Sequence, residues 1–290
     1  MSRRNSEVIA TVDTAETSQT ETSTDSIEAN LPESPTPPES KKIISNVVIS
    51  SDGGAGKSTT ARMLCARHEK KGVVYKLIDA DPKMDVCNSY APELYRRWSN
   101  AEDYLDVGND DSDLMKTQIQ LYDTKVTVGG EDFGDRLLSL CCVNNTITNL
   151  PGNSLQALYS WIDSNYLSDR ELPFDLVFWW VSNGSQADQE AFAKFASQHP
   201  KFKHCIVFNE YHANDWAKFK PISTVTDLIE KNMAREMRLL PQRNRDNVRI
   251  IESGKTFQQL VDSMHPFMGE TLSLWMNKNW TNLEETGLLI

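Results

Sequence analysis

Apolar runs bounded by turn residues alternate along the chain with segments whose apolar residues have helical spacing. Runs at 43–49, 73–78 and 204–208 are continuous enough to predict buried strands. The segments 59–70, 154–164 and 187–198 carry apolar residues three or four positions apart, which predicts helices. A strand, a helix and a second strand joined by a short glycine-containing link form the βαβ unit of a parallel sheet. We therefore predict an α/β fold.

A further helix is expected near the end of the chain, where apolar residues recur at helical intervals. We expect it to pack on the core, because its polar face lacks the basic residues that a membrane-surface helix needs. The residues of this pattern are Leu260, Met264, Phe267, Met268, Leu272, Trp275 and Met276.

Residues 1–40 differ in composition from the rest of the chain. Ser, Thr, Glu and Pro dominate there, and large apolar residues are nearly absent. Such a segment buries too little apolar surface to offset the entropy lost on ordering. We predict a disordered tail over 1–40 and one folded domain over 41–290. The net charge of −11 argues against unspecific binding to polyanions.

The glycine-rich segment after the first predicted strand has the residues of a phosphate-binding loop. Glycines let backbone N–H groups turn inward, and the N-terminus of the following helix adds a positive dipole end. The pattern G-x-x-x-x-G-K-[ST] is matched except that Ser51 stands at the first glycine. In this interpretation Lys57 reaches the β- and γ-phosphates and Ser58 holds Mg²⁺. The predicted nucleotide-binding residues are Gly53, Gly54, Ala55, Gly56, Lys57, Ser58 and Thr59.

Two carboxylates follow the second predicted strand. Asp79 and Asp81 lie one residue apart just before Pro82, at the edge of the sheet that also carries the glycine-rich loop. Carboxylates at this place can serve a Mg²⁺ shell and orient a water molecule toward a γ-phosphate. We predict Asp79 as a metal ligand, and Lys57 and Asp81 as catalytic residues. A charged turn at the end of a strand is the alternative.

The segments 52–59 and 78–82 resemble the deviant Walker A and D-x-D-P motifs of the ParA/MinD family of P-loop ATPases. The resemblance covers about residues 43–254. It implies a doubly wound, mostly parallel sheet with ATP and Mg²⁺ at the strand ends, and a nucleotide-sandwich homodimer. The family's signature lysine is replaced by Asp52, which opposes that dimer. At an effective dielectric near 20, two like charges about 5 Å apart repel by roughly 3 kcal/mol.

The acidic residue that ends the family's Walker B strand is also replaced. The run 146–152 resembles that segment, with Asn149 at the acidic position. An amide can hydrogen-bond a metal-bound water molecule but supplies no charge. The other placement, the run 175–181, would put Trp180 at this position, and we assign that run to a further buried strand instead.

The resemblance also suggests which residues frame the adenine base. A predicted strand ends at Asn209, whose amide can both donate and accept hydrogen bonds. Pro241 and the loop after it resemble the family stretch that flanks the base. Asn at the end of a strand is also a common turn residue.

Two segments have an uneven charge. Residues 99–136 are acidic without calcium-loop spacing, and we interpret them as an exposed insertion or partner face. On a helix predicted around 225–239, Lys231, Arg235 and Arg238 share one face and are a candidate DNA contact. A solvated helix face is the alternative.

The leading hypothesis is an ATP- and Mg²⁺-binding ATPase, slow or activated by a partner protein, in plasmid partition or conjugative mobilisation. The motifs leave two alternatives open. One is a nucleotide-binding switch or scaffold that does not hydrolyse ATP, and the other is a small-molecule kinase or ligase of the dethiobiotin-synthase type. The chain has no apolar run of about 20 residues and no apolar signal core, so a cytoplasmic location without membrane association is expected.

Overall fold

The computed structural model describes residues 42–81, 83, 85–92, 95, 137–152, 154–212, 220–242 and 244–289. The predicted tail and the acidic segment 99–136 lie outside the described residues, so the predictions for both, and the division at residue 40, stay predictions.

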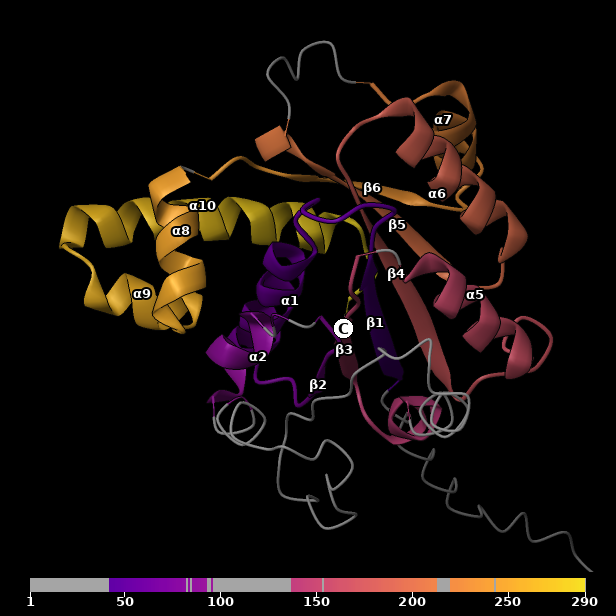
Figure 1. Cartoon of the computed structure of the whole chain (residues 1–290), viewed down its shortest axis with the longest axis horizontal. Helices are drawn as coiled ribbons and strands as arrows, with labels where there is room; N and C mark the ends of the chain where they lie inside the picture. Colours follow the sequence, from indigo (N-terminus) through magenta and orange to yellow (C-terminus); the bar gives the residue numbers. More distant parts are fainter. Residues whose placement is uncertain are drawn as a thin grey trace, which may run out of the picture. The chain divides into compact units, whose positions relative to one another are not determined.

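Six strands form one sheet in the order β2-β3-β1-β4-β5-β6 (Figure 1). Every neighbouring pair is parallel, so the carboxyl ends of all six strands meet at one edge of the sheet. The predicted α/β fold with a parallel sheet is confirmed. The strands are β1 (Ile43–Ile49), β2 (Lys76–Asp79), β3 (Thr146–Asn149), β4 (Phe174–Ser182), β5 (Lys203–Asn209) and β6 (Arg235–Leu239).

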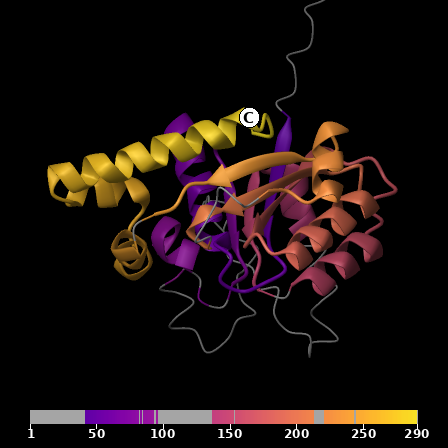
Figure 2. The same ribbon diagram turned by 90° about the horizontal axis from the view of Figure 1, so that it is seen from above.

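Helices cover both faces of the sheet, as the doubly wound arrangement requires (Figures 1 and 2). One face carries α1 (Lys57–Lys71), α2 (Asp85–Tyr90), α8 (Asn244–Ser253), α9 (Phe257–Ser263) and α10 (Pro266–Glu285). The other carries α5 (Leu155–Ser164), α6 (Gln186–Gln198), α7 (Ser223–Glu230) and the helical residues 137–143. A short 3-10 turn, η1 (Glu210–His212), follows β5.

The central strand β4 shows why its sequence is a continuous apolar run. Its side chains alternate between the two faces, and both faces are buried under helices. Trp179 belongs to the core under α1 and α10, whereas Trp180 belongs to the core under α5 to α7. The indole N–H of Trp179 donates to Asn46 Oδ1 at 2.9 Å, which satisfies two polar groups inside the sheet.

Two predictions of helices are wrong. The helix predicted around 225–239 ends with α7 at Glu230, and the chain turns at Asn232, whose φ is +58°. Asn tolerates this left-handed conformation, and the residues after it pair with β5 as strand β6. The single helix expected from 260 to 276 is two helices, because Pro266 starts α10 after a break. Phe267, assigned to the core by its spacing, is 69% exposed.

Candidate nucleotide site

The predicted phosphate-binding loop connects β1 to α1 and has, at two places, a left-handed backbone conformation that favours glycine. Gly54 has a φ of +77° and Gly56 a φ of +108°. A Cβ atom on Gly56 would lie 2.3 Å from Asn209 Nδ2, which leaves no room for a side chain. Gly56 is the N-cap of α1 and no side chain caps the helix there, so the first backbone N–H groups of α1 are suited to bind an anion.

Lys57 is the first residue of α1, and its ammonium group is folded back onto the loop. Nζ donates to Ser50 Oγ at 2.9 Å and to the carbonyl oxygen of Asp52 at 3.2 Å. Burial lowers the pKa of Lys57, while the carboxylates of Asp81 and Asp52 act to raise it. The positive charge of Lys57 therefore lies inside the curve of the loop, and the carboxylates that act on it are those of Asp81 and Asp52.

Asp79 lies on the same sheet edge but has a structural role. Its Oδ2 accepts the backbone N–H groups of Val86 at 3.0 Å and Cys87 at 2.8 Å, and thereby caps α2. Its Oδ1 accepts Asn149 Nδ2 at 2.9 Å. Burial raises the pKa of Asp79 to about 6. A buried carboxyl group with both oxygens engaged is poorly placed to coordinate Mg²⁺, so this geometry does not favour the metal role predicted for Asp79.

Asp81 is the carboxylate that acts most strongly on Lys57. It follows β2, is half-buried, and accepts the N–H of Lys83 at 3.0 Å through Oδ1. Among the charges that raise the pKa of Lys57, that of Asp81 is the largest. Ser58 and Thr59, in the first turn of α1, are also half-buried. The structure thus brings Lys57, Ser58 and Asp81 to one end of the sheet, while the roles predicted for them stay predictions.

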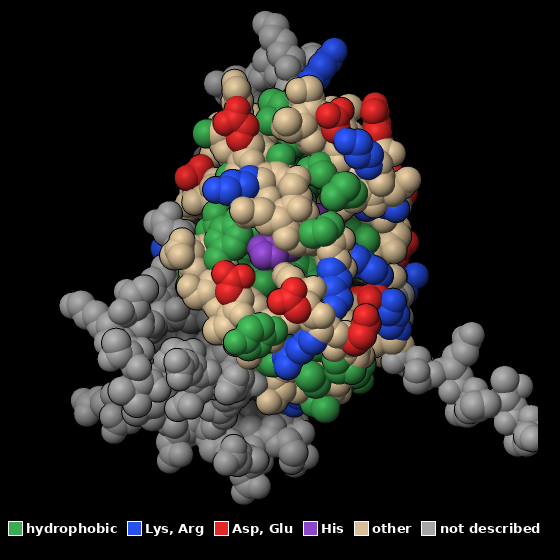
Figure 3. Space-filling view, turned by 90° about the vertical axis from the view of Figure 1, so that its right-hand side faces the viewer, with side chains coloured by type: hydrophobic (Ala, Val, Ile, Leu, Met, Phe, Trp, Pro, Cys, Tyr) green, Lys and Arg blue, Asp and Glu red, His purple; other side chains and the backbone are tan. Residues whose placement is uncertain are grey.

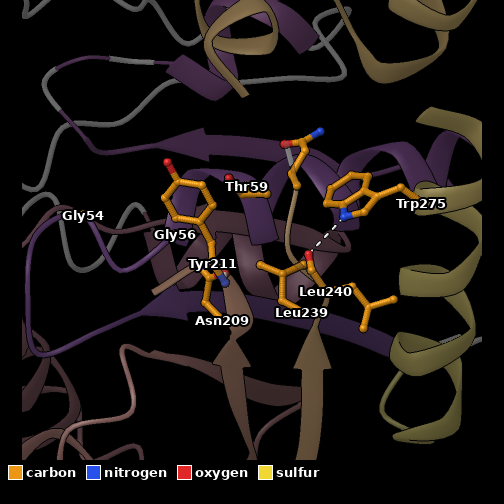
Figure 4. Close-up of a pocket in the computed structure, with 9 residues that line it drawn as sticks. Gly54, Gly56, Thr59, Asn209, Tyr211, Leu239, Leu240 and Trp275 are labelled. Atoms are coloured by element: carbon orange, nitrogen blue, oxygen red, sulfur yellow. Dashed lines mark hydrogen bonds between the residues drawn. The ribbon is translucent and has the colours of Figure 1, made fainter. Parts of the chain in front are cut away.

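A pocket that is partly open to solvent adjoins the loop. Its walls come from the ends of β5 and β6 and from α10 (Figure 4). The indole N–H of Trp275 donates to the carbonyl of Leu240 at 3.0 Å, which fixes the ring beside the strand end. The lining residues are Gly54, Gly56, Thr59, Asn209, Tyr211, Leu239, Leu240, Gln242 and Trp275.

The two residues predicted to frame a base are placed differently from the prediction. Asn209 lines the pocket, but its Nδ2 donates to the carbonyl of Ala55 at 2.7 Å and its Oδ1 accepts the N–H of Tyr211 at 3.2 Å. Asn209 therefore anchors the phosphate-binding loop to the end of β5. Pro241 is exposed and is not one of the lining residues, whereas its neighbours Leu240 and Gln242 are.

The sequence interpretation missed a contact between the loop and α6. The hydroxyl of Ser51 and the indole N–H of Trp180 both donate to Asp188 Oδ1, the latter at 3.0 Å. Asp188 is 3% exposed, and its Oδ2 has no partner among the described residues. The serine at the first glycine position thus ties the loop to α6. The sequence signal that could have indicated this contact is Asp188 itself, an acidic residue in the first turn of α6.

Asp52, which replaces the family's lysine, is exposed and turned toward the residues after β4. Its Oδ2 accepts Asn183 Nδ2 at 3.0 Å. Its negative charge also acts on Lys57. The chain therefore carries a carboxylate at the mouth of the loop, where the family pattern places a positive charge.

The three basic residues proposed as a DNA contact do not share a helix face. Lys231 is the C-cap of α7, while Arg235 and Arg238, three residues apart in β6, lie on opposite faces of the strand. Arg238 also forms ion pairs with Glu236 at 3.2 Å and Glu210 at 3.7 Å. On the side that α5 to α7 cover, basic and acidic side chains are interspersed (Figure 3). The predicted basic face is therefore wrong.

Within the described ranges, no cluster of three or more His, Cys, Asp or Glu side chains is arranged to hold a metal ion. In the same part of the chain, no helix has both the length and the apolar character needed to cross a bilayer.

No protein-family model and no curated protein sequence matches this chain. Solved structures do resemble it. A MinD cell division protein of Aquifex aeolicus is 16% identical, with a TM-score of 0.47 over 74% of this chain and 88% of that one. A nucleotide-binding protein of Archaeoglobus fulgidus in complex with ADP is 16% identical, with a TM-score of 0.43 over 73% and 88%. A McdA–ATP complex of Cyanothece is 13% identical, with a TM-score of 0.44 over 81% and 96%.

One of these structures, the MinD protein, bears the name of the family that the sequence motifs resemble. With identities below 25% and TM-scores below 0.5, the likeness transfers no activity to this chain. The fold class itself is given by the six-stranded parallel sheet and the glycine-rich loop between β1 and α1.

Proposed function

We propose that this protein binds ATP with Mg²⁺ at the carboxyl edge of the sheet and hydrolyses it slowly. The observation that carries the proposal is the buried Lys57 ammonium group inside a loop whose glycines leave the first N–H groups of α1 free to bind an anion. The pocket next to this loop supplies apolar and aromatic walls for a nucleoside.

The residues of the site fit a triphosphate, and they supply some of the ligands that Mg²⁺ needs. Lys57 would exchange its bonds to Ser50 and Asp52 for phosphate oxygens, since both present partners are neutral oxygens and a phosphate is charged. Mg²⁺, when bound, adds positive charge at the phosphates, and Ser58 is the residue suited to hold it. Asp81 is the carboxylate suited to orient a water molecule.

We expect ATP hydrolysis to be slow because of the residues at the ends of β2 and β3. Asn149 supplies no charge at the end of β3, and Asp79 is engaged by α2 and by Asn149. Asp81 is then the carboxylate at the strand ends that remains to act on the attacking water. The same features favour the second candidate, a nucleotide-dependent switch that binds ATP without hydrolysing it.

Binding and single-turnover hydrolysis of γ-labelled ATP test both candidates. Lys57→Ala should abolish binding, while Lys70→Ala, at the exposed other end of the same helix, should bind as the wild type does. Release of labelled phosphate by the wild type supports the ATPase, and binding without release supports the switch. If the wild type does not bind ATP at all, the proposal is wrong.

The biological setting that we propose is plasmid partition or conjugative mobilisation in the cytoplasm, and it is supported by the resemblance of the loop and D-x-D-P motifs. A nucleotide-dependent homodimer belongs to the same proposal, with Asp52 as the opposing charge. Light scattering with and without ATP tests it. Asp52→Lys should strengthen an ATP-dependent dimer, and an unchanged monomer in both proteins would contradict it.

A further inference from the structure

Asp188, near the start of α6, is a buried acidic residue whose side chain contacts the phosphate-binding loop. It is 3% exposed, and its Oδ1 accepts both the hydroxyl of Ser51 and the indole N–H of Trp180, the latter at 3.0 Å. Its Oδ2 has no partner in the described part of the chain. Burial of an incompletely paired acidic group costs free energy, so a neutral side chain would fill this place at less cost. The carboxyl group therefore indicates that its bond to Ser51 serves the loop.

Ser51 lies between the two residues that hold the ammonium group of Lys57. Nζ of Lys57 donates to Ser50 Oγ at 2.9 Å and to the carbonyl oxygen of Asp52 at 3.2 Å. The residues on both sides of Ser51 therefore determine where this positive charge lies. Since Asp188 holds the Ser51 side chain, a displacement of Ser51 would move both partners of the ammonium group.

Asp188 is itself held in place by hydrogen bonds and packing. It lies in the first turn of α6, and its backbone N–H donates to Oγ of the N-cap residue Ser185 at 3.3 Å. Trp180, which donates to its side chain, is fully buried and packs edge-on against Phe192 of the same helix, with 5.9 Å between the ring centroids. A side chain fixed in this way is suited to support a binding group from behind.

The contact acts on Lys57 through the position of the loop. The hydroxyl of Ser51 has one proton, and it donates this proton to Asp188, so it has none left to donate to a phosphate. The charges that raise the pKa of Lys57 are those of Asp81 and Asp52. What Asp188 can change is therefore the place of the loop residues that hold the ammonium group.

We propose that Asp188 is a positioning residue of the nucleotide site, which through the hydroxyl of Ser51 holds the phosphate-binding loop where Lys57 can reach the phosphates. This inference rests on the proposed function, since it concerns the affinity for the phosphates that the loop binds. The pattern G-x-x-x-x-G-K-[ST] has a glycine in place of Ser51, and glycine has no hydroxyl to hold. The contact thus belongs to this chain's own departure from the pattern.

A double-mutant cycle on the full chain tests the proposal by calorimetry with ATP and inorganic tripolyphosphate. Ser51→Ala removes the hydroxyl, and Asp188→Ala removes its acceptor. Each variant should bind both ligands about 10-fold more weakly, because a misplaced binding group loses most of its interaction. If the two side chains act as one contact, the double variant should also bind about 10-fold more weakly, and not about 100-fold.

Conservative variants separate the position of the loop from the packing of the core. Ser51→Thr keeps the hydroxyl and Asp188→Asn keeps an oxygen acceptor, so both should recover most of the lost affinity. Asp188→Asn should nevertheless melt at a lower temperature, since its NH₂ group would replace the buried Oδ2, which has no partner among the described residues. Affinity and stability would then change independently, which a merely structural role of Asp188 does not allow.

Glu190→Ala is the matched control, because Glu190 is an exposed acidic residue of the same helix that bonds to Gln186. It should bind both ligands as the wild type does. Thermal melting establishes that each variant is folded. If Asp188→Ala does not fold, Ser51→Ala and Ser51→Thr carry the test, because Ser51 lies at the half-buried surface of the loop.

Each outcome decides the question. A coupled loss of affinity in the alanine variants, with recovery in the conservative ones, supports the inference. Wild-type affinities in Ser51→Ala and Asp188→Ala overturn it and leave the proposed function intact. Losses that add in the double variant, that the conservative variants do not recover, or that are confined to ATP overturn it as well. If the wild type binds neither ATP nor tripolyphosphate, the proposed function itself fails.

Discussion

At the scale of single residues, Gly56 is the position where the phosphate-binding loop tolerates least change. Alanine there would have a φ of +108° and a Cβ 2.3 Å from Asn209 Nδ2. Backbone strain of this kind costs about 1 to 3 kcal/mol, and relief of the clash would move the loop. We expect Gly56→Ala to lower the free energy of unfolding by about 2 to 4 kcal/mol and to abolish ATP binding.

Gly53→Ala is the matched control in the same loop. Nothing lies within 4 Å of a Cβ at Gly53, and its φ is not positive. A compatible replacement of glycine reduces the entropy of the unfolded chain, so this variant should be as stable as the wild type or slightly more stable. Urea denaturation of both variants measures the difference. Equal stability of the two would contradict the strain argument.

Asp79 makes the stability of the protein depend on pH. Burial raises its pKa to about 6, whereas in the unfolded chain it is about 3.9. Between these values the native state holds a proton that the unfolded state has lost, so the contribution of Asp79 to stability falls as the pH rises from 4 through 6. Above pH 6 Asp79 is ionised in the folded protein, and its buried charge then lowers the free energy of unfolding by the full amount.

Asp79→Asn should therefore be more stable than the wild type at pH 8, by about 1 to 3 kcal/mol. The new amide keeps an oxygen for the N–H groups of Val86 and Cys87, and its NH₂ group can donate to Asn149 Oδ1, which has no partner in the described part of the chain. The difference should close as the pH falls to 4. Denaturation across this pH range tests it, and a difference that does not vary with pH would refute the charge argument.

At the scale of elements, the loop is anchored from two sides by segments far away in the sequence. Asn209 at the end of β5 holds the carbonyl of Ala55, and Asp188 in α6 holds the hydroxyl of Ser51. The β1–loop–α1 unit itself could be predicted from the sequence, because its apolar run, glycines and lysine are adjacent. The two hydrogen bonds that anchor the loop could not be predicted, since 154 residues separate Asn209 from Ala55 and 137 separate Asp188 from Ser51.

The same distinction explains the errors in other elements. The spacing of Lys231, Arg235 and Arg238 is compatible with a helix, but pairing with β5, a contact distant in sequence, makes the segment a strand. The position of Asp79 at the sheet edge was predictable from the apolar run before it. Its capping role was not, because the D-x-D-P spacing does not reveal that α2 starts at Asp85 with its N–H groups facing the carboxylate.

Asn209→Ala tests the anchoring of the loop by β5. The change leaves the Ala55 carbonyl without its donor and should lower the free energy of unfolding by about 1 to 2 kcal/mol. Since the anchor acts on the loop, affinities for ATP and for tripolyphosphate should fall by the same factor. The ratio of ATP to GTP affinity should stay constant.

Asn183→Ala is the control, because both side-chain bonds of Asn183 are exposed: its amide donates to Asp52 Oδ2 and accepts the N–H of Ser185. It should change the unfolding free energy by less than about 0.5 kcal/mol. Calorimetry with ATP, GTP and inorganic tripolyphosphate gives the affinities, and urea denaturation gives the free energy of unfolding. Loss of ATP binding with full retention of tripolyphosphate binding in Asn209→Ala would instead assign Asn209 to the base.

At the scale of the whole molecule, α10 closes the open edge of the sheet and one wall of the pocket at once. β6 is an edge strand, and exposed edges pair readily with other chains. Side chains of α10 bind its backbone: Asn282 Nδ2 donates to the carbonyl of Arg238 at 2.8 Å, and Asn279 Oδ1 accepts the N–H of Leu240 at 2.9 Å. The same helix presents Trp275 to the pocket (Figure 4).

Asn279→Ala should therefore affect both the stability and the pocket. Asn279 is fully buried and also donates to the carbonyl of Trp275 at 2.9 Å, so its removal leaves the N–H of Leu240 unpaired and loosens the turn that carries Trp275. We expect the free energy of unfolding to fall by about 1 to 3 kcal/mol. ATP affinity should fall more than tripolyphosphate affinity, because the base side of the pocket loses its support.

Asn277→Ala, two positions away on the same helix and exposed, should alter neither quantity measurably, since its contact with Lys70 is at the surface. Light scattering during mild heating adds a third readout, because a β6 edge released from α10 should raise the rate of association between chains. If Asn279→Ala loses stability while ATP and tripolyphosphate affinities fall equally, α10 serves the sheet edge alone and the pocket wall depends on the strands.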